Sequence, residues 1–163
     1  MNHFARCDVL QDVLTFDGIP LHPLVVHVVV VLLPLAGLGA MLLAVRPAWR
    51  RTYGIPVLLL GLVSTAAVPL ATETGEQLEH ALPRGNQLIE VHAQRADTLL
   101  PVAIAFVVLL AIAVLGDRIA AVARIRLLPG GAAVLAGISG AVVIGLVAWI
   151  GHAGATAVWS GVG

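Results

Sequence analysis

The sequence predicts an all-α protein: a four-helix transmembrane bundle built from two antiparallel hairpins. Two observations support this prediction. Of the 163 residues, 60% are hydrophobic and 11% are charged, and the apolar residues gather in four long runs. A soluble domain is about 45–50% apolar and about 25% charged, so this composition excludes a disordered chain, a nucleic-acid-binding protein and a conventional soluble enzyme.

Each of the four runs is long enough to cross a bilayer. A hydrocarbon core of about 30 Å needs about 20 apolar residues in a helix. None of the runs contains Asp, Glu or Arg, and all are too long and too uniformly apolar for the alternating strands of a barrel. We predict an N-terminal tail (1–20) and a membrane domain (21–163) with spans at residues 24–45, 53–71, 98–116 and 130–151.

Proline positions modify the predicted helices. Pro23, Pro56 and Pro101 fall in or near first turns, where a missing N–H costs little. Pro34 and Pro69 lie deeper and are expected to kink or end their helices.

Small residues line the fourth run. They recur at Gly137, Ala141 and Gly145, with Ala132, Ala136 and Gly140 beside them. This pattern allows two helix backbones to approach closely. Packing inside the bundle is the first interpretation; a homodimer face and room beside a flat cofactor are the alternatives.

The arginines predict the orientation. The chain has nine arginines and no lysine; six lie in the links 46–52 and 117–129, and three lie on the opposite side, as do eight of the nine acidic residues. By the positive-inside rule the six-arginine side is cytoplasmic, so both termini are expected outside (N-out/C-out). Residues 1–20 have no apolar core of signal-peptide type, so the first span is expected to direct insertion.

All six histidines are predicted to lie on or near the outer side. They are His3, His22, His27, His80, His92 and His152. His22 and His27 begin the first span, His92 precedes the third and His152 follows the fourth. Three helices therefore bring imidazoles to one membrane level, where a polar residue usually faces the bundle interior.

Acidic residues accompany the histidines. Beyond the second run the chain continues at helical spacing with Glu73, Glu76, Glu79 and His80. These side chains share one face if the helix continues, a prediction that Gly75 weakens. With Arg84 and Arg95 nearby, the outer end is expected to be a polar cup of imidazoles and carboxylates.

Three chemistries suit this cup. A Zn, Cu or Fe ion could be held by imidazoles and carboxylates, with these candidate ligands: His22, His27, Glu73, His92 and His152. A b-type haem could be held by two imidazoles from facing helices, with its propionates on Arg84 or Arg95. A proton relay is the third, and a hydrogen-bonded network that only caps helix ends is the structural alternative.

His27 is the favoured haem ligand, because it is the deepest histidine and an unpaired imidazole there costs roughly 1–3 kcal/mol. His92 is the favoured opposite ligand and His152 the next. His22 is expected to stabilise the turn at Pro23 or to orient a ligand.

Sharper catalytic motifs are absent from the sequence. It contains no HExxH, no CxxCH, no Glu-x-x-His pair and no phosphate-binding glycine loop. The single cysteine, Cys7, cannot form an intrachain disulfide and is assigned no role. We therefore predict no catalytic residues and no stand-alone enzyme.

Three segments resemble the DUF2231 family of bacterial membrane proteins, whose function is not established. GIPLHPLVVH resembles its G-x-P-x-H-P-x-x-V-H opening, ATETGEQLE with IEVHAQRAD resembles its middle, and GHAGATAVWSGVG resembles its ending. The resemblance covers residues 18 to 163 and implies that His22, His27, His92 and His152 are the family histidines. Ala155 replaces a glycine of the ending, and Trp159 stands where tyrosine is usual.

Some members of the family are fused to Rieske-type or c-type cytochrome domains, which implies a place near electron transfer. We therefore expect a membrane-embedded redox-cofactor-binding protein of the bacterial cytoplasmic (inner) membrane, carrying haem b as an electron-transfer or accessory subunit. A His/Glu metal-ion protein and a non-catalytic scaffold are the alternatives. The expected partners are the lipid bilayer and a second copy or a larger respiratory complex, with no nucleic acid.

Cysteine labelling tests the predicted orientation. In a background without Cys7, Arg50→Cys and Arg124→Cys are expected to resist a membrane-impermeant thiol reagent in intact cells, because the six-arginine links face the cytoplasm. Asn86→Cys is expected to react. The reverse pattern would move the histidines to the cytoplasmic side.

Overall fold

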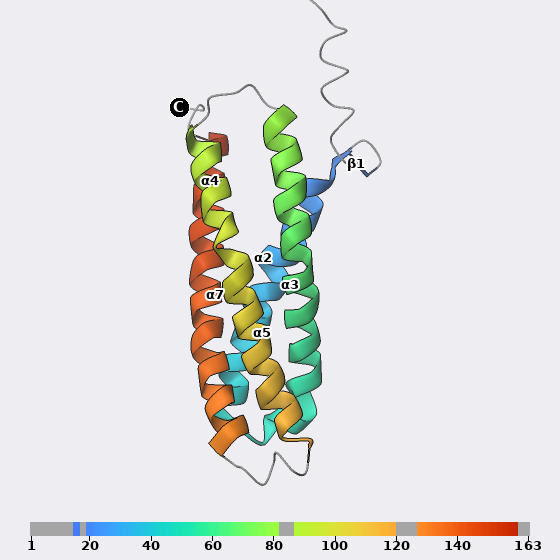
Figure 1. Cartoon of the computed structure of the whole chain (residues 1–163), viewed down its shortest axis with the longest axis vertical. Helices are drawn as coiled ribbons and strands as arrows, with labels where there is room; N and C mark the ends of the chain where they lie inside the picture. Colours follow the sequence, from blue (N-terminus) through green and yellow to red (C-terminus); the bar gives the residue numbers. More distant parts are fainter. Residues whose placement is uncertain (1–14, 17–18, 82–86, 120–126, 160–163) are drawn as a thin grey trace, which may run out of the picture.

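The four apolar runs form long helices that run up and down the molecule (Figure 1). They are α2 (Leu21–Val45), α3 (Trp49–Ala81), the consecutive helices α4 (Gln87–Asp97) and α5 (Leu99–Gly116), and α7 (Leu127–Trp159). Four segments are long and apolar enough to cross a membrane. The predicted class, an all-α bundle of two helical hairpins, is confirmed: α2 pairs with α3, and α4–α5 pair with α7.

The computed structural model describes residues 15–16, 19–81, 87–119 and 127–159. Positions discussed above that lie outside the described residues are His3, Arg6, Cys7, Arg84, Asn86, Arg124 and Arg126. Before α2, β1 (Thr15–Phe16) and β2 (Ile19–Pro20) form a two-residue antiparallel pairing.

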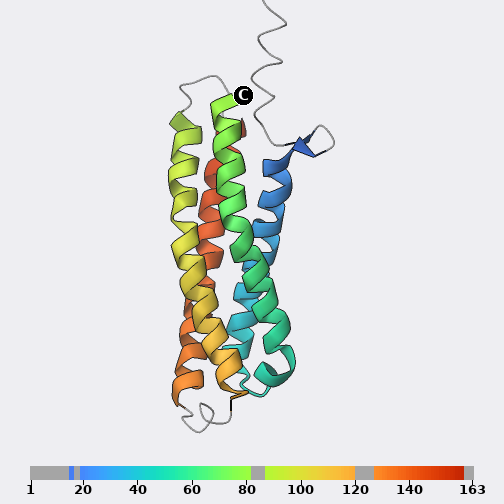
Figure 2. The same ribbon diagram turned by 45° about the vertical axis from the view of Figure 1, so that its right-hand side comes forward.

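The two ends of the bundle differ in their side chains. We call one end the histidine end: α2 begins there, α3 and α7 end there, and it carries His22, His80, His92 and His152. The other is the arginine end, with Arg46, Arg50, Arg51 and Arg118. In both views the described helices place the start of α2 and the end of α7 at the same end of the bundle (Figures 1 and 2).

The helices extend well beyond the apolar runs at the histidine end. α3 and α7 have 33 residues each and are therefore about 50 Å long, against a hydrocarbon core of about 30 Å. Gly75 does not interrupt α3, so the predicted continuation through Glu73, Glu76 and Glu79 is confirmed. Pro34 and Pro69 do not end their helices.

The third span is divided at Thr98, between α4 and α5. Pro101 has no N–H to donate to the carbonyl of Asp97, and its ring crowds that carbonyl. Thr98 instead turns back on α4, with its N–H 3.2 Å and its hydroxyl 2.7 Å from the carbonyl oxygen of Arg95. Pro101 thus lies in the first turn of α5, as its sequence position predicts.

The bundle has a narrow core and a wide apolar exterior. Each hairpin packs internally, α2 packs against α7, and α3 packs against α5. The most buried large side chains are those of Phe106, Leu33, Leu110, Val114 and Val143. Many other large apolar side chains are exposed on the outer faces of the spans, which is the distribution expected when lipid is the solvent.

Two glycines bring α2 and α7 into backbone contact. A Cβ atom built at Gly140 would lie 2.9 Å from the carbonyl oxygen of Gly37, and one at Gly37 would lie 2.8 Å from that of Gly140. Gly137 packs against Ala44 in the same interface. Gly137 and Gly140 therefore serve internal packing, whereas Ala141 and Gly145 are exposed.

Polar contacts join the two hairpins at the arginine end. Buried Arg50 forms an ion pair with Asp117 at 3.2 Å and donates to the carbonyl of Pro129 at 3.1 Å. Arg118 donates to the carbonyls of Val114 at 2.6 Å and Arg51 at 2.8 Å. One side chain from each turn thus connects α3, α5 and α7, a role that sequence analysis did not assign to these arginines.

Substitutions at Gly140 and Gly145 test the backbone contact. Gly140→Ala is expected to lower the free energy of unfolding by about 1–3 kcal/mol, because the added methyl overpacks the interface with α2. Gly145→Ala is the matched control on the same helix, since nothing lies within 4 Å of its Cβ position. Denaturation in detergent micelles measures both; equal losses would contradict the assigned contact.

Candidate functional site at the histidine end

His22 joins the start of α2 to the end of α3. Its Nδ1 lies 2.9 Å from the carbonyl oxygen of Ala71 and 3.4 Å from the hydroxyl of Thr74. Its half-buried ring lies on Gly75, where a Cβ atom would be 3.0 Å from the ring Cε1. A side chain at position 75 would therefore displace the imidazole.

His92 makes the same contacts in the other hairpin. Its Nδ1 lies 3.1 Å from the carbonyl oxygen of Ile150 on α7, and its ring lies on Gly154. A Cβ atom at Gly154 would be 3.0 Å from Cε1 and 3.2 Å from Nδ1 of His92; the corresponding distances from Gly75 to His22 are also 3.0 Å and 3.2 Å. The two arrangements are geometrically equivalent.

We call this arrangement a histidine clasp: an imidazole, the carbonyl to which it donates, and a glycine four residues after that carbonyl. One clasp is His22, Ala71 and Gly75, and the other is His92, Ile150 and Gly154. In this comparison α2 of the first hairpin corresponds to α4 of the second, and α3 corresponds to α7. The same local arrangement thus occurs once in each hairpin.

The clasps define which ring nitrogen carries the proton. A carbonyl oxygen only accepts hydrogen bonds, so Nδ1 must be the protonated nitrogen of each neutral ring, and Nε2 keeps its lone pair. His22 and His92 belong to different hairpins. The structure thus presents two oriented imidazoles, each with its lone pair on Nε2.

The other predicted ligands are placed differently. His27 is exposed, and its Nδ1 bonds to the carbonyl of Pro23 in its own helix. His152 is also exposed and, at about 100° per residue, lies on the opposite side of α7 from Ile150. Among the described residues, no group of three His, Cys, Asp or Glu side chains is placed to hold a metal ion. The ligand roles of His27 and His152 stay predictions.

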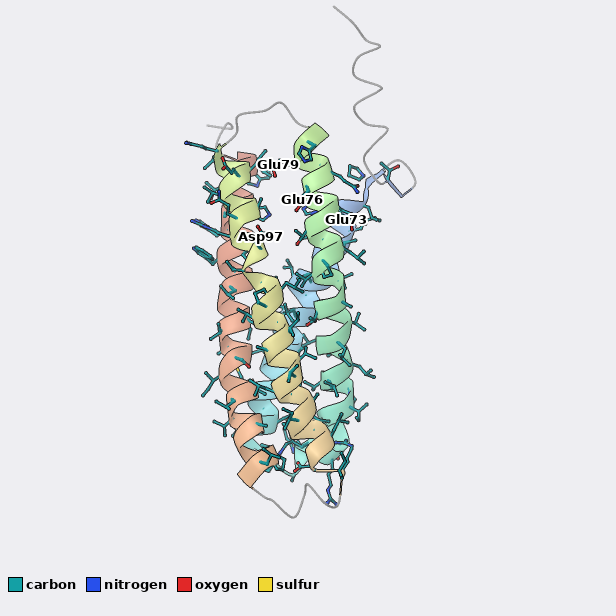
Figure 3. All side chains as sticks on the ribbon, in the orientation of Figure 1. Glu73, Glu76, Glu79 and Asp97 are labelled. Carbon is teal, nitrogen blue, oxygen red and sulfur yellow. The ribbon has the colours of Figure 1, made fainter. Side chains whose placement is uncertain are left out.

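Carboxylates line a hollow between α3 and the α4–α5 junction. This acidic hollow measures about 220 Å³ and is lined by Pro69, Thr72, Glu73, Glu76, Asp97 and Leu100. Figure 3 shows Glu76 and Asp97 on its two sides, with Glu79 further toward the end of α3. Glu73, a predicted metal ligand, belongs to this hollow.

Arg95 is held against α7. Its guanidinium lies 4.2 Å from the ring centre of Trp149, an arrangement that stabilises a cation over an aromatic face. It lies one helical turn from His92 on α4. The predicted propionate-binding residue therefore has a defined position, close to one of the two clasps.

The fold is that of a multi-pass membrane protein, with a histidine clasp in each hairpin at one end of the bundle. The chain belongs to the DUF2231 family, described as predicted membrane proteins, whose profile matches residues 18–163. The comparison confirms the resemblance noted in the opening, middle and closing motifs. No curated protein and no solved structure gave a significant match.

Sequence reasoning missed the two glycines and Thr74. The signal lay in two short segments, ATETG (71–75) and IGHAG (150–154), which both place a glycine four residues after an apolar residue at the end of a span. Neither segment indicates which histidine packs on it, because that pairing depends on the tertiary contact.

Nitrogen NMR of labelled imidazoles tests the clasps. The signals of His22 and His92 are expected to be those of the Nδ1-protonated tautomer. Gly154→Ala is expected to shift the His92 signals, because the new methyl meets the ring, while Gly151→Ala, with open space around its Cβ position, leaves them unchanged. An Nε2-protonated His92, or equal shifts in both variants, would exclude the clasp.

Proposed function

We propose that the protein binds a b-type haem between His22 and His92 and serves as an electron-transfer or accessory subunit in the membrane. One observation carries the proposal: two imidazoles from opposite hairpins are each oriented through Nδ1 by a carbonyl, which leaves the ring lone pair on Nε2. When bound, haem supplies one-electron Fe(III)/Fe(II) chemistry. The protein's part is to hold and orient the two axial ligands.

The number of donors favours haem over a bare ion. Zinc and related ions take three or four protein ligands, and the described residues offer no group of three. A porphyrin supplies four nitrogens of its own and leaves two axial positions. His22 and His92 would supply two imidazole ligands, one from each hairpin.

Neighbouring groups support the same ligand pair. A carbonyl that accepts from Nδ1–H orients a coordinating imidazole and raises its basicity. Arg95, one turn along α4 from His92, suits a propionate because guanidinium and carboxylate form paired hydrogen bonds. Its stacking on Trp149 limits the side-chain entropy lost on binding.

Porphyrin binding requires the ends of the two hairpins to separate. The acidic hollow, at about 220 Å³, is smaller than the roughly 300–1,000 Å³ of ordinary ligand sites. α3 packs lightly against α4, so few apolar contacts oppose the opening. The close contact of Gly37 with Gly140 would meanwhile hold the remainder of the bundle together.

A metal-ion site is the second candidate, and the acidic hollow favours it. Carboxylates of Glu73, Glu76 and Asp97 line this hollow, and they would suit Zn, Cu or Fe if a histidine and water completed the coordination. We further propose that the histidine end faces outward across a bacterial inner membrane. Five of the six described acidic residues lie at that end and four of the five described arginines lie at the other, which supports this orientation.

Absorption spectra of purified protein, expressed with haem supplied, test the proposal. The wild type is expected to show a reduced-minus-oxidised b-type spectrum. His22→Ala and His92→Ala are each expected to abolish it by removing an axial ligand. His80→Ala, an exposed histidine on the same end, is the matched control and is expected to keep the spectrum.

His27→Ala separates the two ligand assignments. If His22 is the haem ligand, the His27→Ala variant is expected to retain the b-type spectrum. If His27 is the ligand, as its sequence position favoured, the variant is expected to lose the spectrum. The metal content of the same sample is also measured. Colourless protein with stoichiometric zinc or copper would support the metal-ion function instead of haem binding. Colourless, metal-free and folded protein would support a scaffold role.

A further inference from the structure

At the arginine end, positive charge exceeds the negative charge available to balance it. Asp117 is the one acidic side chain among the described residues there, and it is paired with Arg50 at 3.2 Å. Arg46, Arg51 and Arg118 are exposed. The Arg46 guanidinium contacts an aromatic ring and that of Arg118 donates to backbone carbonyls. Among the described residues, neither these two guanidiniums nor that of Arg51 forms an ion pair with a carboxylate.

Aromatic side chains indicate the depth of these guanidiniums. Trp49 and Tyr53 are exposed, pack edge-to-face with ring centres 5.8 Å apart, and suit the headgroup level of a bilayer. The Arg46 guanidinium lies 5.6 Å from the centre of the Trp49 ring. Exposed Val45 continues the lipid-facing surface immediately below. The unpaired cations therefore lie at the lipid–water boundary.

The local chemistry at that boundary suits a phosphate. A guanidinium binds phosphate through two parallel hydrogen bonds. α3 begins at Trp49, so its N-terminus adds partial positive charge beside Arg51. Arg118 of the second hairpin donates to the carbonyls of Arg50 and Arg51, which brings its guanidinium to the same helix start. The Arg118 guanidinium thus lies beside the backbone of Arg51 on the α3–α5 side, and the Arg46 guanidinium lies against Trp49.

We propose that the arginine end binds anionic phospholipid headgroups through Arg46, Arg51 and Arg118. The phosphodiester oxygens take the place of the missing carboxylates, and the acyl chains lie along the exposed apolar faces of α3 and α5. A headgroup on Arg51 and Arg118 connects the two hairpins at the end opposite the histidine clasps. This proposal is independent of what the histidine end binds.

Lipid retention in native mass spectrometry tests the proposal. Protein is reconstituted in nanodiscs of mixed phosphatidylcholine and phosphatidylglycerol, extracted, and assayed for retained lipid. The wild type is expected to be enriched in phosphatidylglycerol. Arg46→Gln/Arg51→Gln is expected to reduce that enrichment about tenfold. Arg118 is left intact, because its donation to carbonyls also stabilises the fold.

Arg95→Gln is the matched control, since Arg95 lies at the histidine end on Trp149; it is expected to retain phosphatidylglycerol like the wild type. Equal retention of the two lipids by the wild type would overturn the proposal, as would equal losses in Arg95→Gln and the double variant.

Thermal stability in pure phosphatidylcholine discs is measured with added inorganic phosphate. A rise equal to that caused by phosphatidylglycerol would assign the site to a soluble anion instead.

Discussion

The contact between Gly37 and Gly140 is the constraint on which the rest of the bundle depends. It lies between the two hairpins and brings the α2 and α7 backbones together without intervening side chains. In lipid there is no hydrophobic drive between helices, so association rests on such close packing and on polar contacts. With this spacing set in the middle, the ion pair at one end and the imidazoles at the other become reachable across the hairpin boundary.

The two ends use polar groups in opposite ways. At the arginine end, Arg50 of one hairpin bonds to Asp117 and to the carbonyl of Pro129 of the other. At the histidine end each clasp is contained within one hairpin, and carboxylates from both hairpins line the acidic hollow. The hairpins therefore meet through an ion pair at one end and across a hollow at the other.

Sequence predicted the helices, their number and the gathering of histidines at one end, because each depends on runs of residue types along one helix. It also predicted the α3 extension, since Glu73, Glu76 and Glu79 keep helical spacing. It did not predict that His22 is half-buried while His27 is exposed. The two differ by five residues, or about 140° around α2, and which direction faces α3 is decided by the packing of the hairpin. Sequence analysis favoured His27 because it lies deeper in the apolar run. Depth along the helix does not indicate in which direction around the helix a side chain points.

The repeated clasp gives the chain one local feature of a two-fold dimer of hairpins joined into one polypeptide. In a true dimer every position occurs twice, so both faces of a ligand on the axis meet the same residues. In a single chain, the corresponding positions of the two halves can carry different residues. Two residues after Ala71 stands Glu73, and two residues after Ile150 stands His152; Thr74 likewise corresponds to Ala153. Covalent joining therefore lets one flank of the axis be acidic and the other basic, so that a symmetric ligand pair has distinguishable sides.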